Sequence, residues 1–440
     1  MLLYSAALTP RLSYITAFIG NELFGAPIYV TTNLLEFESY IGPRINYSPA
    51  SIGEREFHIA NAELLFQKHI ATQPVHCFHV NGIKAFYQTA GRDFPFDIFA
   101  ASFYLLARYE EYLPYEKDKY GRYAHVNSLA FKQSFLHLPL VNTWLAEFKA
   151  SLERKFPRLP FKSSPFVLLP TYDIDMAYSY LSKGFLRNAG GFLKSLLNFD
   201  LPAVIKRARV LTSGHNDPFD CYNWLNALHK ASKLEAHYFF LLARKQSGVD
   251  KNIPPHAKRL RQLIRDQTAA HQTGIHPSWR SGDHNDELIT EKASLEKIAG
   301  KKIINSRQHY LRFTLPGTYR QLISAGIERE FSMGYGSING FRASVASSFY
   351  WYDLQNETAT NLRIFPFCFM DTNAFYHQKL TAQQALEEMK TLYDSVKKVN
   401  GMMITIWHNH LLATDREFTS WREVYERFLR EVCLNQDLQD

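Results

Sequence analysis

The feature of this 440-residue sequence that most limits its possible folds is the alternation of short apolar runs with longer amphipathic segments after residue 165. Strands that are apolar throughout and separated by helices are typical of a parallel sheet covered by helices. Thr381 and Gln384 also form a capping-box signature at the start of one expected helix. We therefore predict an α/β fold for residues 166–440, a (β/α) barrel of about seven strands.

The expected strands are Phe166–Leu169, Ala236–Leu242, Thr273–His276, Ile303–Asn305, Phe331–Met333, Ile364–Phe369 and Met402–Trp407. The expected helices between and after them include Phe219–Ala231, Pro255–Ala269, Asp286–Ile298, Tyr319–Ala325, Ala382–Val399 and Trp421–Val432.

The first 155 residues are expected to form a separate and smaller α+β domain. The stretch Lys155–Pro165 (KFPRLPFKSSP) is rich in proline and serine, as linkers are. Before it, Ile28–Leu35 is an expected strand and Ile98–Leu113 an expected helix, with Asp97 capping its first turn. The histidines of this part have no carboxylate partners at a catalytic or metal-binding spacing, so we assign it no role.

Composition excludes several classes of protein. Hydrophobic residues make up 46% and charged residues 21%, an ordinary globular mixture. The net charge of +8 is not concentrated in a basic stripe, so no nucleic-acid partner is expected. The four cysteines are far apart, which predicts reduced thiols. We find neither a signal peptide nor an apolar run long enough to span a bilayer, and we expect a cytoplasmic protein.

Polar clusters follow several of the expected strands. In a (β/α) barrel, residues just past the carboxyl ends of the strands meet at one rim. Carboxylate oxygens and imidazole nitrogens are ligands that a divalent metal such as zinc takes in proteins. Each cluster alone also fits a simpler interpretation, a cap or a loop histidine, so the prediction depends on their occurring together. The clusters are Thr171–Asp175, His276–Trp279, Ser306–Tyr310 and His408–His410.

These segments resemble, in order, the motifs of the polysaccharide deacetylase family, the NodB-homology domain, whose fold is a distorted (β/α) barrel. The resemblance covers about Phe166 to Phe428, and it is carried by Thr171–Asp175, Gly274–His276, Arg307–Tyr310, Glu330–Met333 and Ile404–His408. The first 155 residues resemble an uncharacterised N-terminal domain that precedes such barrels in bacterial proteins.

The resemblance implies a hydrolase that removes N-acetyl groups from a carbohydrate by means of metal-activated water. It implies a divalent metal, with zinc expected, held by Asp175 and His276. Asp173 would be the general base, kept ionised by Arg307. The backbone N–H near Tyr310 would face the developing oxyanion, and His408 would protonate the departing amine.

The sequence departs from the family pattern at the second metal histidine, where it has Arg280. A guanidinium cannot ligate a cation. His309, His284 and His271 are alternatives, of which His309 is slightly favoured over having no substitute. Glu330 also stands where the family has aspartate, and its longer arm could shift Arg307.

Three functions therefore stay open. The first is a deacetylase acting on an N-acetylated glycan or a lipid-linked or nucleotide-linked sugar intermediate. The second, favoured by Arg280, is a catalytically degenerate barrel that serves as a glycan-binding or assembly module in polysaccharide biosynthesis. The third is a hydrolase of another amide or of an ester. Beyond the motifs, Asp371 is either a rim residue or a cap, and Arg342 is a candidate for pairing an anionic group of the substrate.

Overall fold

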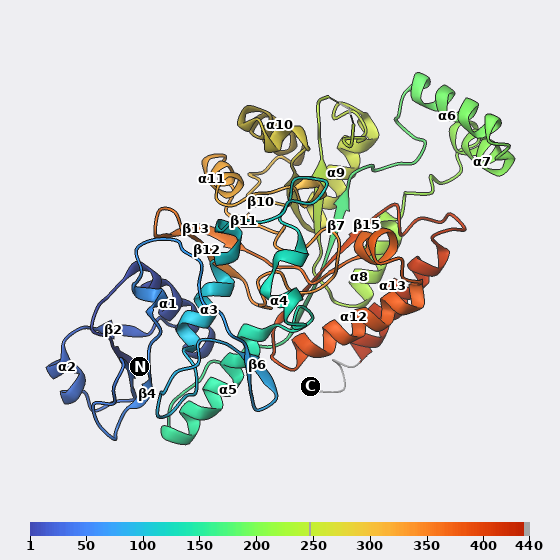
Figure 1. The fold of residues 1–440 in the computed structure, drawn as a ribbon. Helices are drawn as coiled ribbons and strands as arrows, with labels where there is room; N and C mark the ends of the chain where they lie inside the picture. Colours follow the sequence, from blue (N-terminus) through green and yellow to red (C-terminus); the bar gives the residue numbers. More distant parts are fainter. Residues whose placement is uncertain (246–247, 435–440) are drawn as a thin grey trace.

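The structure, a computed structural model, describes residues 1–245 and 248–434 (Figure 1). The N-terminal part contains a parallel four-stranded sheet of order β2-β1-β3-β4. Its strands are β1 Leu2–Tyr4, β2 Tyr29–Thr31, β3 Arg44–Tyr47 and β4 Phe57–Ile59. Its longer helices are α1 Pro10–Phe24, α3 Ile98–Leu106 and α5 Leu140–Lys155, with the short α2 Leu34–Ser39 and α4 Leu129–Lys132 and a β-hairpin of β5 Phe78–Val80 and β6 Ile83–Ala85.

Two expected elements of this part are shorter than predicted. Asp97 caps α3 as predicted, by accepting a hydrogen bond from the Ala100 N–H. The helix then ends at Leu106, and Arg108 adopts a left-handed backbone that starts a separate 3-10 turn. The strand expected over Ile28–Leu35 covers only β2, because the Asn33 side chain accepts backbone N–H bonds and starts α2.

The C-terminal part is built on a nine-stranded sheet of order β12-β13-β11-β10-β9-β8-β7-β15-β14. Neighbouring strands are parallel, apart from the antiparallel pair β12 and β13. The strands are β7 Val167–Ile174, β8 His237–Leu241, β9 Gln272–His276, β10 Asn305–Ser306, β11 Arg329–Glu330, β12 Phe349–Asp353, β13 Thr358–Ile364, β14 Phe369–Met370 and β15 Met402–His408. The predicted α/β class with a parallel sheet is confirmed.

Residues 365–368 link β13, near one end of the sheet, to β14 at the other end. At the start of this segment the Phe365 N–H donates to the carbonyl of Glu330, the last residue of β11. At its end the Cys368 N–H donates to the Ile404 carbonyl of β15. A compact apolar cluster lies against this stretch, separate from the main core: Leu169, Phe239, Leu311, Phe331, Phe367, Met370, Ile404 and Ile406. The strand pairing itself does not join β12 to β14, so closure of a barrel stays a prediction.

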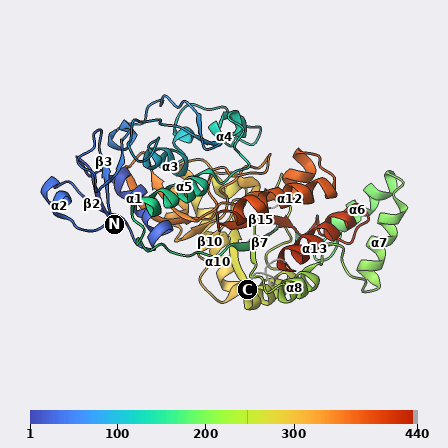
Figure 2. The ribbon, with the colours of Figure 1, turned by 90° about the horizontal axis from the view of Figure 1, so that it is seen from below.

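Helices cover the sheet, and most of the predicted ones are present with shifted ends (Figures 1 and 2). They are α8 Tyr222–Ala231, α9 Lys258–Ala270, α10 Asn285–Ala299, α11 Gly317–Ser324, α12 Ala382–Lys397 and α13 Thr419–Leu434. The capping box of Thr381 and Gln384 is present at α12. In the described residues no helix is long and apolar enough to cross a membrane.

In the C-terminal part four elements were missed by the sequence analysis. The helices α6 Phe185–Leu197 and α7 Leu201–Thr212 lie within a segment to which we assigned no element. The hairpin of β12 and β13 extends the sheet, so the count of about seven strands was too low. Three predicted strands are displaced: in place of Ile303–Asn305, Phe331–Met333 and Ile364–Phe369 the structure has β10, β11 and β14.

The N-terminal part makes buried polar contacts with the C-terminal part. The Glu111 carboxylate accepts hydrogen bonds from Arg108 Nε at 2.7 Å and from Arg342 Nη2 at 2.6 Å, with all three side chains buried. Arg11 pairs with Glu357 of the β12–β13 turn. The idea that Arg342 faces an anionic substrate is therefore wrong, because its guanidinium is already neutralised inside the protein. That residues 1–155 form a domain of their own stays a prediction.

We predict that Glu111→Ala lowers the free energy of unfolding by about 3–5 kcal/mol, because it leaves the buried Arg342 without its carboxylate and leaves the buried Arg108 with Glu110 alone. Urea denaturation of the full chain measures this. As a control, Glu153→Ala removes one side of an exposed ion pair with Lys149 and should change stability by less than about 1 kcal/mol. Equal effects of the two substitutions would contradict the role given to Glu111.

Candidate metal centre

The candidate site lies where the central parallel strands end. Asp173 is the next-to-last residue of β7, and Asp175 follows that strand. His276 and His408 are the last residues of β9 and β15, and His408 lies opposite Asp173 in the sheet register. His309 is in a 3-10 turn shortly after β10. Residues up to 235 positions apart in sequence are therefore brought to one edge of the sheet.

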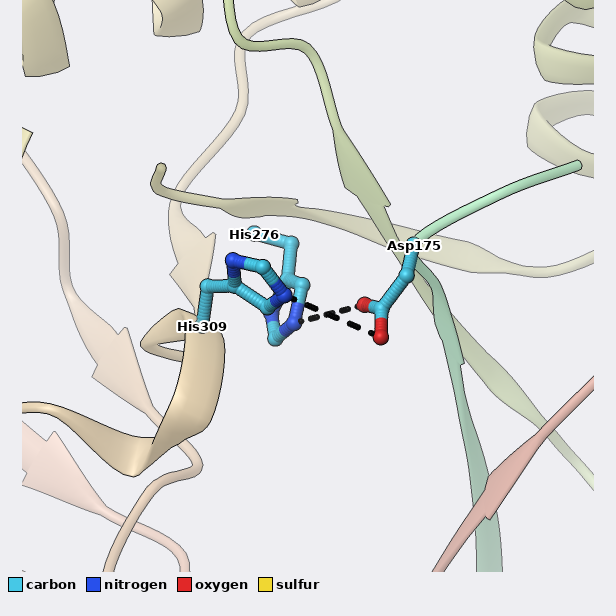
Figure 3. Close-up of side chains that lie close together, drawn as sticks. All are labelled: Asp175, His276 and His309. Carbon is cyan, nitrogen blue, oxygen red and sulfur yellow. Dashed lines mark ion pairs between the residues drawn. The ribbon is translucent and has the colours of Figure 1, made fainter. Parts of the chain in front are cut away.

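Three side chains form a cluster that could hold a metal ion (Figure 3). His276 Nε2 is 3.2 Å from Asp175 Oδ1, and His309 Nε2 is 3.7 Å from Asp175 Oδ2. One ligand atom from each of the three residues lies within 4.8 Å of the others. Both imidazoles are buried, whereas the Asp175 side chain is 27% exposed. The cluster is therefore open toward solvent only on the carboxylate side.

Hydrogen bonds fix which nitrogen of each histidine faces the cluster. His276 Nδ1 is 2.6 Å from the Arg307 carbonyl oxygen, so Nδ1 carries the proton and donates it. His309 Nδ1 is 2.8 Å from Asp250 Oδ1 and donates in the same way. Each Nε2 then faces Asp175, and in the neutral form of the ring it offers its lone pair there. Such contacts to the outer nitrogen are what orient metal-ligating histidines.

The donor set fits a divalent cation. Asp175 Oδ1 is buried and makes no hydrogen bond, although it faces His276 Nε2. A carboxylate oxygen and an imidazole nitrogen held this close need either a proton or a cation between them. Burial raises the pKa of Asp175, but the neighbouring charges of His309 and His408 outweigh it and hold the pKa well below its usual range. Two imidazole nitrogens and one carboxylate oxygen with an open position are a donor set that divalent metals such as zinc take in proteins.

Asp173 lies beside this cluster and is paired with an arginine. Arg307 Nη1 donates to Asp173 Oδ1 at 2.8 Å, and both side chains are buried. The guanidinium also donates from Nε to the Phe331 carbonyl and lies 4.4 Å above the Phe239 ring. Asp173 Oδ2 is left 3.8 Å from His276 Nε2. The arginine therefore holds one carboxylate oxygen and leaves the other to face the cluster.

His408 reaches the cluster from β15, the strand next to β7 in the sheet. Its Nδ1 is 2.7 Å from Asp371 Oδ1, and its backbone N–H donates to the other oxygen of the same carboxylate. Its Nε2 is 3.9 Å from Asp175 Oδ2. Burial lowers the pKa of His408, but the Asp371 carboxylate more than offsets this and raises the pKa to about 9. Asp371 is thus buried under the site, where it orients His408.

Tyr310 follows His309 and lines the same cavity. Its backbone is in the left-handed region, with φ at +58°, which is uncommon for a residue with a side chain. Arg122 of the N-terminal part donates from Nη1 to the Tyr310 carbonyl at 2.5 Å. The turn that carries Tyr310 is therefore held from outside the sheet.

Two residues at which the sequence departs from the family motifs, Arg280 and Glu330, lie away from the cluster, as do His284 and His271. Arg280 is in a separate turn and pairs with Glu287. His284 is exposed at the start of α10, and His271 contacts Asn226. Glu330 is buried, where it accepts hydrogen bonds from Ser332 and Tyr319 and makes none with Arg307. Of the three alternative ligands, only His309 reaches the cluster.

A cavity of about 600 Å³ opens over these groups. Besides the predicted residues, its lining includes three residues of the N-terminal part, Lys119, Tyr120 and Arg122. Tyr120 packs against Tyr310 and Trp279, with ring centroids 5.2 Å and 6.1 Å away. Neither these residues nor Asp250 was identified from the sequence, since none stands at the end of an expected strand.

Comparison with known proteins gives limited further information. Residues 1–157 match DUF7033, a family of unknown function. No curated protein matches the chain in sequence.

Solved structures give weak matches. A presumed polysaccharide deacetylase of Mycobacterium smegmatis is 13% identical, with a TM-score of 0.39, over 62% of this chain and 86% of that one. An allantoinase is 13% identical, with a TM-score of 0.39, over 61% and 84%. A polysaccharide deacetylase of Bacillus cereus is 12% identical, with a TM-score of 0.30, over 60% and 88%.

We predict that Asp250→Asn weakens zinc binding by about ten- to a hundredfold. The reason is that an uncharged amide oxygen accepts a weaker hydrogen bond from His309 Nδ1 than the carboxylate does. Competition of the purified protein with a zinc-binding dye measures the affinity. Asp283→Asn, which changes an exposed partner of Arg312, is the matched control and should bind zinc as the unmodified chain does. Unchanged affinity in Asp250→Asn would show that this contact does not support a metal ligand.

Proposed function

We propose that this protein is a metal-dependent hydrolase that removes the acetyl group from an N-acetylated carbohydrate. The observation that carries the proposal is the placing of three kinds of group around one cavity. These are the donor cluster of Asp175, His276 and His309, the carboxylate of Asp173 and the imidazole of His408. Amide hydrolysis needs a base and an acid beside a cation site, and this cavity brings such groups together.

A divalent ion held by Asp175, His276 and His309 would polarise the acetyl carbonyl and make water acidic enough to attack it. Asp173 would accept a proton on Oδ2, since Arg307 stabilises its ionised form through Oδ1. His408 would donate a proton from Nε2 to the departing amine, since Asp371 holds its Nδ1. The backbone near Tyr310 would face the oxyanion that develops on the substrate.

The substrate class is supported by the motif resemblance and by the shape of the site. The cavity is large enough for one or two sugar rings at the usual size of ligand pockets, about 300–1,000 Å³. Aromatic side chains at its wall, Tyr120 and Tyr310, suit the apolar face of a sugar. An N-acetylated glycan or sugar intermediate is therefore the expected partner.

Cys77, Cys221 and Cys368 are free thiols, which is consistent with a cytoplasmic location.

A catalytically degenerate barrel that binds glycans is the second candidate. The observation that favours it is Arg280, which replaces the histidine expected from the motif. His309 offers a substitute nitrogen, and the two candidates differ in whether the chain releases acetate.

We predict that the zinc-loaded protein releases acetate from N-acetylated oligosaccharides and that Asp173→Asn lowers the rate by about a hundred- to ten-thousandfold. An enzyme-coupled acetate assay over a panel of such sugars measures this. Asp266→Asn, an exposed change on α9, is the control and should keep the full rate. Sugar binding without acetate release by any form of the protein would favour the degenerate module.

We also predict that Asp371→Asn lowers kcat by roughly a hundredfold while zinc content stays the same. The amide cannot stabilise the protonated imidazole, so His408 would no longer be held as a proton donor. Single-turnover kinetics and metal analysis of the same preparation separate the two effects. A loss of zinc in Asp371→Asn would mean that this carboxylate supports the metal site instead.

A further inference from the structure

The helices α6 and α7 form a hairpin that projects from the body of the protein (Figures 1 and 2). They pack on each other and are joined by a short turn that contains Phe199 and Asp200. The hairpin is inserted between β7, which carries Asp173, and α8. It is therefore an addition to the layer of helices that covers the sheet.

The hairpin exposes an unusual number of large apolar side chains. Phe199 is 89% exposed, Phe185 85% and Leu186 84%. On α6 the exposed apolar residues recur at helical spacing and make one apolar stripe, and the turn and α7 add further exposed apolar side chains. The exposed set is Phe185, Leu186, Leu193, Leu196, Leu197, Phe199, Leu201, Ile205 and Leu211. Exposed apolar side chains gathered on one hairpin mark a site of interaction.

The charge of the hairpin is almost entirely positive. Between residues 183 and 212 the only acidic residue is Asp200. The basic residues of the same stretch are Lys183, Arg187, Lys194, Lys206, Arg207 and Arg209. A short amphipathic helix with basic residues beside a Leu- and Phe-rich face is the signature of a helix that lies in a membrane interface.

The base of the hairpin rests on the rim of the cavity. Arg187 of α6 donates to the backbone carbonyls of Lys251 and Asn252, and Lys251 lines the cavity. Lys206 of α7 forms an ion pair with Asp415, in the loop that follows His408 and His410. The apolar surface is thus attached on both sides to segments that border the candidate site.

We propose that the α6–α7 hairpin binds the surface of a bilayer that contains anionic phospholipid. The apolar side chains would enter the headgroup–acyl boundary, and the exposed Lys194 and Arg209 would pair with lipid phosphates. The 13 residues of α6 span only about 20 Å, so the helix would lie in the interface rather than cross it. Docked in this way, the hairpin places the mouth of the cavity near the membrane surface.

Charge decides between a lipid surface and a second copy of this chain. Two copies pairing through this face would bring two strongly positive surfaces together, with only Asp200 from each to offset them. An anionic bilayer offers opposite charge and an apolar interior at the same time. The proposal therefore commits to the lipid.

The experiment is co-sedimentation of the full chain with vesicles of phosphatidylcholine alone and with about one-third phosphatidylglycerol. We expect binding to the anionic vesicles, weakened by salt, and at least a tenfold loss in the double variant Leu197→Ser/Phe199→Ser. The matched control is Leu35→Ser/Ile41→Ser, which changes two equally exposed apolar side chains of the N-terminal part and should bind as the unmodified chain does. Circular dichroism checks that both variants are folded.

Absence of binding to anionic vesicles, or equal binding by both double variants, would overturn the proposal. So would a dimer of the unmodified chain that Leu197→Ser/Phe199→Ser dissociates, because the apolar face would then be covered by a second copy. Vesicle binding requires no turnover, so its outcome is independent of whether the protein releases acetate.

Discussion

The arrangement on which the site depends is the carboxylate of Asp175 facing two imidazoles whose outer nitrogens are already engaged. The Arg307 carbonyl holds His276 and the Asp250 carboxylate holds His309, so both rings present Nε2 inward. Lone pairs that converge in a buried place are unfavourable unless a proton or a metal cation lies between them. Arg307 also joins the cluster to Asp173, because it supplies its carbonyl to His276 and its guanidinium to Asp173.

The N-terminal part contributes to this site rather than only adjoining it. Arg122 holds the turn of Tyr310, and Lys119 and Tyr120 line the cavity. An ion pair with Asp118 fixes Arg122, so the segment 118–122 is held in place where it lines the cavity. The buried contacts of Glu111 with Arg342 connect the same region to the loop after β11. These contacts give the first 155 residues a physical connection to the chemistry.

The sequence predicted the α/β class, six of the covering helices and the side chains at the strand ends, because each of these follows from local periodicity. Asp173, Asp175, His276 and His408 stand directly at the ends of apolar runs, and the parallel sheet brings such ends together. The helix α6 was missed because its paired glycines and exposed leucines do not suggest a helix that packs against a core. The strands β12 and β13 were missed because β13 is polar and mostly exposed.

Asp250 and Tyr120 were missed for a different reason: they reach the site from loops, and only the three-dimensional path of the chain places them there. The same holds for the replacement of the expected second histidine. Arg280 stands at the motif position, yet it pairs with Glu287, while His309 arrives from the following turn. The sequence offered His309 as one of three alternatives and favoured it only slightly over having no substitute, because the contact between its Nε2 and Asp175 exists only in three dimensions.

The most direct test of the metal centre is anomalous diffraction at the zinc absorption edge from crystals of the zinc-loaded protein. The account predicts one strong peak within about 2.0–2.3 Å of Asp175 and of the Nε2 atoms of His276 and His309. A peak bound by other residues, or an empty cluster in a protein that holds zinc elsewhere, would contradict it.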